Sequence, residues 1–443
     1  MYIHAGIVLG VMVFVFVVAR VLRLSTELSM FAAALIGLIV HGISIPPREI
    51  LGSTFNWFEV PRHILDGAFT YFDVVLIFLT ATLFMNLLKE AGGIVYIVRG
   101  IVRRFHRHRT LALLLLTLVM LIPGALTGSG TVTVLVVGSL VGTVLKYMGV
   151  SDVRVAAIIF MCAAMSAAAP PINLWAMMSA AGSNMPYVGF FLPLGVLSLL
   201  GALFTMFYLG WRGTALDLDR VMAELPKPPV GMSWWKVALP FGVLFALILA
   251  GRIWPWSMPV LGLPLIFVIA AAIVVLLNPG KLHVLQVASD TVDQLLPLIG
   301  VMVVVGVLVQ IMALSGARGL ISLGIVTMPL TVLFATLFII LPFSEGLIQY
   351  AVAPLIGVPL VLLFNMKGFN PIIALAGMAV MWPIGDMLPP TTVVGRATVM
   401  VLGFKGSYYR DFVKTCLVPS AFILLLGSLC IVFSNKLGFL VGG

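Results

Sequence analysis

The sequence APPIN at residues 169–173 and the sequence DMLPPTT at residues 386–392 each interrupt a long apolar stretch. Proline removes a backbone donor and ends or kinks a helix. Each Pro-Pro pair therefore predicts a helix that is broken inside a hydrophobic segment. The first prolines of the two pairs lie 219 residues apart (389 − 170). This spacing indicates that the chain contains two related halves.

The composition places these breaks inside a membrane. Of 443 residues, 62% are hydrophobic and only 9% are charged, whereas soluble domains carry about 25% charged residues. This chain has too little polar surface to cover a water-soluble body of its size. We therefore expect an all-α polytopic membrane protein in the lipid bilayer. The composition excludes a soluble enzyme and a nucleic-acid-binding protein.

Apolar segments long enough to cross a membrane as helices recur along the chain. We expect ten crossings, at about residues 5–22, 25–43, 67–88, 156–182, 187–210, 237–251, 258–278, 292–314, 369–402 and 416–434.

Two further apolar segments, 110–148 and 329–366, are too long for one crossing and contain Gly and Pro near their middle. These are predicted to be re-entrant hairpins, with tips at TGSGT (127–131) and FSEG (343–346). The tips are offset by 216 residues (346 − 130).

The distribution of Lys and Arg gives the expected orientation. With these crossings, 18 of the 25 basic residues fall on one side, including the run at 103–109, and six on the other. Arg396 is left inside the membrane. Because cytoplasmic loops are enriched in Lys and Arg, we expect the 18-residue side to be cytoplasmic. In a bacterial inner membrane both termini would then be periplasmic.

The order of elements predicts inverted repeats, which are typical of secondary transporters. We expect N-terminal scaffold helices at 1–66, a cytoplasmic linker at 211–236 and further scaffold helices at 237–291. The first repeat would occupy 67–210, with hairpin 110–148 and broken helix 156–182. The second would occupy 292–434, with hairpin 329–366 and broken helix 369–402.

Helix breaks inside a membrane free backbone groups that can hold ions. Carbonyl and hydroxyl oxygens suit Na⁺, a hard cation. The expected Na⁺ ligands at the tips and the second break are Gly128, Ser129, Ser344, Glu345, Asp386 and Thr391. The expected substrate-binding residues are Gly130, Thr131, Asn173, Thr392 and Arg396.

Arg396 has two interpretations. A guanidinium inside a membrane needs a carboxylate partner. That carboxylate belongs either to a substrate or to an internal ion pair with Asp386 or Glu345. Both remain open from the sequence.

The pattern resembles the large membrane subunit of the tripartite ATP-independent periplasmic (TRAP) transporters, within the ion-transporter superfamily. The resemblance rests on AGG (91–93) before the basic run, the Gly-Ser-Gly tip, APPI (169–172) and, after Glu345, APLIGVP (353–359). It covers roughly residues 67–434. It implies a Na⁺-driven elevator-type importer of a carboxylate. It also implies a small four-helix membrane subunit and a periplasmic substrate-binding protein as partners.

An alternative within transport is a stand-alone relative of the same superfamily. It would carry a carboxylate with Na⁺ or H⁺, form a homodimer and use no binding protein. A channel needs a continuous polar pore, and the spans contain too few polar residues to line one. The chain also lacks a nucleophile–base constellation, so we expect no enzyme. No cofactor or metal is expected beyond Na⁺ as coupling ion.

Overall fold

The computed structural model describes residues 2–44, 60–213, 217–254, 259 and 261–441. Within these ranges the regular secondary structure is entirely helical, as the composition predicts. Arg48, one of the six basic residues counted on the less basic side, and residues 258 and 260 of the expected span 258–278 lie outside the described residues.

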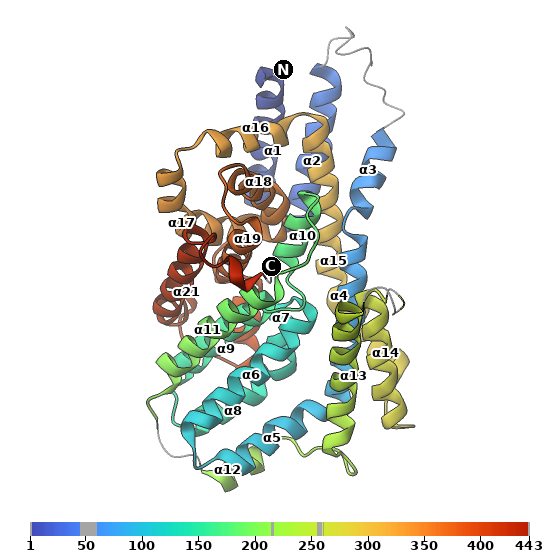
Figure 1. Cartoon of the computed structure of the whole chain (residues 1–443), viewed down its shortest axis with the longest axis vertical. Helices are drawn as coiled ribbons and strands as arrows, with labels where there is room; N and C mark the ends of the chain where they lie inside the picture. The colour runs from blue at the N-terminus through green and yellow to red at the C-terminus, as the bar shows by residue number, and fades with distance from the viewer. Residues whose placement is uncertain (1, 45–59, 214–216, 255–258, 260, 442–443) are drawn as a thin grey trace.

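The N-terminal and middle helices pack into a frame (Figure 1). Helix α1 packs on α2, and the 31-residue α15 packs on α2, α3 and α4. Helix α14 packs on both α4 and α13. The expected domain boundaries at 66/67 and 291/292 fall inside α3 and α15. The helices are α1 (Tyr2–Val21), α2 (Thr26–Ser44), α3 (Val60–Phe69), α4 (Phe72–Glu90), α13 (Trp234–Ile253), α14 (Leu263–Leu277) and α15 (Val284–Leu314).

The first hairpin follows an amphipathic helix. Helix α6 ends at Gly128, whose φ of 67° is left-handed, a backbone conformation that glycine adopts without a Cβ penalty. The returning arm then begins at Gly130. The elements are α5 (Gly93–Phe105), α6 (Arg109–Thr127), α7 (Gly130–Thr133), the π-helix η2 (Val134–Gly138) and α8 (Ser139–Tyr147).

The second hairpin turns later than predicted. Helix α17 continues through 343–346, and the turn comes at Gln349, with φ 51°. Gly346 is a close-packing position here, because a Cβ on it would lie 2.9 Å from the Cβ of Leu388. The elements are α16 (Ala317–Thr327), α17 (Leu330–Ile348), the 3₁₀ helix η3 (Gln349–Ala351), the π-helix η4 (Ala353–Gly357) and α18 (Val358–Met366).

Both Pro-Pro sites interrupt helices, and both Pro-Pro peptide bonds are cis. The first break separates α9 from α10, and the second separates the α19–η5 segment from α20. The remaining elements are α9 (Asp152–Ala168), α10 (Leu174–Gly182), α11 (Phe191–Gly210), α12 (Leu218–Glu224), α19 (Pro371–Met381), η5 (Trp382–Met387), α20 (Val393–Val401), η6 (Tyr408–Val413), α21 (Lys414–Val432) and η7 (Gly438–Leu440).

The two halves share one register of elements. The π-helices η2 and η4 begin 219 residues apart (353 − 134), and so do α10 and α20 (393 − 174). The elements that follow the two turns, α7 and η3, also begin 219 residues apart (349 − 130), rather than the 216 residues predicted for the tips. Figure 1 shows α5 across the bottom of the molecule and α16 across the top.

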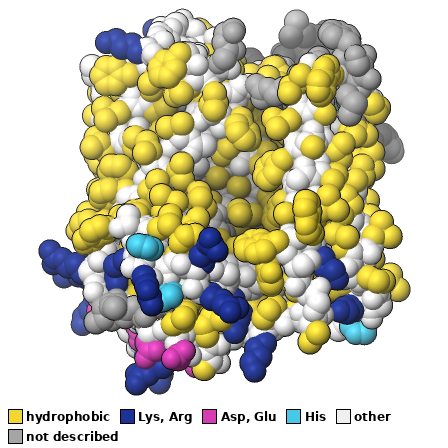
Figure 2. Space-filling model, turned by 60° about the horizontal axis from the view of Figure 1, so that its bottom comes forward, with side chains coloured by type: hydrophobic (Ala, Val, Ile, Leu, Met, Phe, Trp, Pro, Cys, Tyr) yellow, Lys and Arg dark blue, Asp and Glu magenta, His cyan; other side chains and the backbone are white. Residues whose placement is uncertain are grey.

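Ten helices among the described residues are long and apolar enough to cross a membrane. The number matches the prediction, but the set differs. Both arms of the first hairpin qualify, whereas Leu263–Leu277 and the interrupted segment Pro371–Met387 are shorter. Figure 2 shows hydrophobic side chains over the upper part of one face, with Lys and Arg gathered below them. The chain is a multi-pass membrane protein.

The charge bias predicts opposite orientations for the two ends of this fold. Cysteines introduced at Arg104, in the last turn of α5, and at Lys367, after α18, should react with a membrane-impermeant maleimide from opposite sides. Both positions are exposed, and the native Cys162, Cys416 and Cys430 are buried. Labelling of both introduced cysteines from the same side would contradict the inverted orientation of the halves.

Candidate functional site

A cavity of about 240 Å³ lies where the two hairpin turns meet the second helix break. Three stretches of the halves contribute to it: the first turn, the second turn and the segment around α20. Helix α15 and the first turn of α2 contribute the other lining residues. The lining residues are Glu27, Ser129, Thr131, Val132, Gln294, Leu295, Pro297, Leu298, Val301, Gln349, Tyr350, Asp386, Val393 and Val394.

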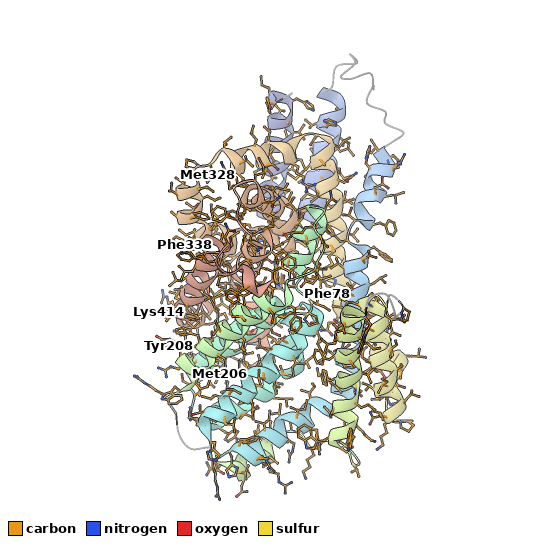
Figure 3. The ribbon with its side chains drawn as sticks, in the orientation of Figure 1. Phe78, Met206, Tyr208, Met328, Phe338 and Lys414 are labelled. Carbon is orange, nitrogen blue, oxygen red and sulfur yellow. The ribbon has the colours of Figure 1, made fainter. Side chains whose placement is uncertain are left out.

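The first turn brings Ser129 to the cavity. Ser129 caps α7, and its hydroxyl accepts a hydrogen bond from Val132 N at 3.4 Å. The turn is packed closely, because a Cβ on Gly128 would lie 3.4 Å from the ring of Phe78 on α4. Figure 3 labels Phe78 beside this turn. On Gly130, a Cβ would lie 3.2 Å from Val394. The turn is therefore held by contacts from two other elements.

The first helix break is tied to the first hairpin. Ile172 N, in the break, donates a hydrogen bond to Ala125 O at 3.1 Å. The buried hydroxyl of Ser166 accepts from Gly124 N at 2.8 Å and donates to Leu121 O at 2.8 Å. Because unpaired backbone groups are costly in a membrane, these bonds hold the break against the hairpin.

The second break is tied to the second hairpin in the same way. The backbone N and the hydroxyl of Thr391 both donate to Gly346 O, at 3.3 and 3.0 Å. The hydroxyl of Tyr408 donates to Met387 O at 3.1 Å. Thr392 is left-handed, with φ 48°, and its buried hydroxyl has no hydrogen-bond partner among the described residues.

Two acidic side chains are buried at the second hairpin and break. Asp386 is 5% exposed and lines the cavity, whereas Glu345 is fully buried behind it. Glu345 Oε2 accepts a hydrogen bond from Trp175 Nε1 of α10 at 2.8 Å. Its second oxygen, Oε1, has no hydrogen-bond partner in the part of the chain that the structure describes. A carboxylate from the second half thus meets an indole from the first.

Other predicted site residues lie away from the cavity lining. Asn173 caps α10: its oxygen accepts from Ala176 N and its amide donates to Ala168 O, both at 2.8 Å. The hydroxyl of Ser344 donates to Leu341 O within α17. The Arg396 side chain is exposed. None of the ion pairs in the described part of the chain involves it.

Several polar residues of the site were missed from the sequence. Gln349 and Tyr350 follow the predicted tip by only a few residues, and correct placement of the turn would have found them. Gln294 is a polar residue in a long apolar helix, which was an available signal. The sequence gave no indication of Glu27 or Trp175. Glu27 reaches the cavity, and Trp175 reaches Glu345, only because segments distant in sequence pack together.

Comparison with known proteins corrects the family expectation. A model of the Na⁺/H⁺ antiporter family matches residues 1–211, slightly less than half of the chain. No curated protein matches the chain. The TRAP-type interpretation is wrong, because neither the family model nor the solved structures with the same fold are of that type. The Gly/Pro motifs behind it indicate hairpins and breaks but do not distinguish the families that contain them.

Two solved structures share the fold. MtrF of Neisseria gonorrhoeae, described with a class of antimetabolite efflux pumps, has a TM-score of 0.63 at 14% identity, over 93% of this chain and 95% of its own. The YdaH transporter of Alcanivorax borkumensis has a TM-score of 0.62 at 15% identity, over 95% of this chain and 100% of its own.

The matching family model and the two similar structures are of transporters, not of enzymes. The expectation that this chain is not an enzyme is therefore confirmed. Each of the two solved structures matches as one chain over nearly its whole length. The expected partners, a small four-helix membrane subunit and a periplasmic binding protein, are therefore also wrong.

The role of Ser166 in holding the first break can be tested by stability. Ser166→Ala removes the acceptor for Gly124 N and the 2.8 Å partner of the buried Thr133 hydroxyl. This should lower the free energy of unfolding by about 1–3 kcal/mol, as measured by a mixed-detergent titration. Ser151→Ala is the control, because Ser151 is exposed and its side chain makes no capping bond. Equal stabilities of the two variants would contradict the role of Ser166.

Proposed function

We propose that this chain is a stand-alone secondary transporter that exchanges Na⁺ for H⁺ at the cavity between the hairpin turns. The observation that carries the proposal is the chemistry of the lining. It contains two carboxylates, Glu27 and Asp386, and no Lys, Arg or His. A cavity with this charge favours a cation over a carboxylate substrate.

The oxygens at the cavity suit a hard cation. Ser129 brings a hydroxyl, Gln349 an amide oxygen and Asp386 a carboxylate. Hard cations take such oxygen ligands. No group of three or more His, Cys, Asp or Glu suited to another metal occurs among the described residues. The match to a Na⁺/H⁺ antiporter family model over residues 1–211 supports Na⁺ and H⁺ as the two exchanged ions.

The function would be carried out in a bacterial inner membrane with both termini periplasmic. Inverted repeats would let the two hairpins and the two broken helices move as a unit against the frame of α1–α4 and α13–α15. The 219-residue register of the elements supports this arrangement.

Na⁺-coupled transport of a carboxylate is the second candidate. One observation favours it: Thr392 leaves an unpartnered, buried hydroxyl at the N-terminus of α20, where the helix dipole favours an anion. The exposed Arg396 lies outside the cavity lining, so this candidate lacks the guanidinium that the sequence had offered for the substrate.

The proposal predicts the effect of neutralising Asp386. The purified chain, reconstituted without partners, should move protons when a Na⁺ gradient is imposed, as measured by a pH-sensitive dye inside the vesicles. Asp386→Asn should slow this flux by about tenfold or more, since a loss of about 1.4 kcal/mol of binding corresponds to a factor of ten.

Arg396→Lys is the matched control and should leave the flux unchanged. Uptake of a panel of labelled carboxylates, with and without Na⁺, runs in parallel. Na⁺-dependent carboxylate uptake that falls in Arg396→Lys, without proton movement, would replace the proposal with the second candidate.

A further inference from the structure

We propose that a second cavity, of about 340 Å³, binds the headgroup of an aminophospholipid, which is a lipid with a primary ammonium and a phosphate. Three segments line this cavity: the end of α4, residues 229–232 of the linker and the turn between α14 and α15. It is separate from the cavity at the hairpin turns, because the two have no lining residue in common. Binding here does not depend on which ion the chain transports.

Two opposite charges face this cavity without pairing with each other. Glu90 ends α4 and Lys281 lies in the turn before α15, and both are exposed residues of the lining. Neither takes part in an ion pair within the ranges that the structure describes. The neighbouring Lys89 is directed elsewhere, because its ammonium donates to Leu135 O at 3.0 Å. A carboxylate and an ammonium that are held apart in this way suit a ligand that carries both charges.

A backbone contact holds Lys281 at the cavity. Its ammonium donates one hydrogen bond to Val230 O of the linker at 2.9 Å, which leaves two N–H groups for a phosphate. Asn278, at the end of α14, is only 5% exposed and also lines the cavity. Its amide nitrogen donates to Val274 O at 2.9 Å, which leaves the side-chain oxygen to accept from an ammonium.

The residues around the cavity place it at the level of lipid headgroups. Val230, in the lining, is 93% exposed, and Trp235, five residues further on, is 78% exposed. Exposed tryptophans are typical of the interface between a membrane and water. Trp234 packs on α5, with its ring centroid 5.3 Å from that of Tyr96, and Figure 1 shows this end of α13 beside α5 at the bottom of the molecule. A lipid headgroup reaches such a place while its chains stay in the bilayer.

The cavity also touches the joint between the frame and α5. Ala91, in the lining, connects α4 to Gly92, the N-cap of α5, whose φ is 79°. A Cβ on Gly92 would collide with Pro229 of the linker, which also lines the cavity. A headgroup bound here therefore bridges α4, the linker and the α14–α15 turn at the point where α5 leaves the frame.

The two charges distinguish an aminophospholipid from other phospholipids. Phosphatidylglycerol offers nothing cationic to Glu90, and the ammonium of phosphatidylcholine has no N–H to donate. The primary ammonium of phosphatidylethanolamine supplies both a charge and N–H donors to Glu90, while its phosphate accepts from Lys281.

Native mass spectrometry of the purified chain, titrated with these three lipids, tests the site. The wild type should bind phosphatidylethanolamine most tightly. Lys281→Gln should weaken that binding by about fivefold or more, the loss expected when a charge-assisted hydrogen bond is removed at an exposed site. Glu90→Gln should weaken it similarly and remove the preference over phosphatidylcholine. The matched controls are Asp73→Asn, in the first turn of α4, and Lys367→Gln, after α18; both residues are exposed, and both variants should bind as the wild type does.

Glu90→Lys gives a second readout, because it places a second positive charge at the cavity. The preference should switch from phosphatidylethanolamine to phosphatidylglycerol, which a purely structural role of Glu90 would not produce. Equal binding of phosphatidylethanolamine and phosphatidylcholine by the wild type, or unchanged binding in both Glu90→Gln and Lys281→Gln, would overturn the inference. Displacement of the lipid by an equal concentration of soluble phosphoethanolamine would overturn the assignment to a lipid.

Discussion

Backbone groups that are not used by a helix must find partners inside the membrane, and the whole site depends on this constraint. Each helix break here finds its partner in the hairpin of its own half. Ile172 N bonds to Ala125 O, and Thr391 N bonds to Gly346 O. These bonds fix the hairpin turns beside the breaks. The polar groups of the turns therefore lie around one cavity.

The charge of the cavity depends on which side chains the hairpin turns and the second break place in its lining. Asp386 reaches the cavity, Glu345 remains behind it, and the indole of Trp175 from the other half joins the second hairpin to the first break. The cavity lining has acids and amides but no cationic side chain. A cavity with this lining favours a cation over an organic anion.

Part of this was predictable from sequence because proline and glycine act locally. The Pro-Pro pairs located both breaks, and Gly128 located the first turn. The second turn was misplaced because Gly346 was interpreted as a helix breaker, whereas it lies inside α17 and allows close packing against Leu388.

The remainder depends on contacts between distant segments. The Trp175–Glu345 hydrogen bond joins residues 170 positions apart, and the approach of Glu27 to the cavity is set by the packing of α2 on α15. Arg396 was assigned from its position after a break, but the direction of its side chain is set by the rotation of α20. The hydrophobic pattern could not give that rotation, because both faces of this short helix contain apolar residues.

Binding of radioactive Na⁺ to the purified single chain distinguishes a cation site at Asp386 from a site for carboxylates. We expect saturable binding that weakens as the pH falls, is lost in Asp386→Asn and is not displaced by carboxylates. Saturable binding that is unaffected by pH and by Asp386→Asn would contradict it, and so would the absence of Na⁺ binding at any pH.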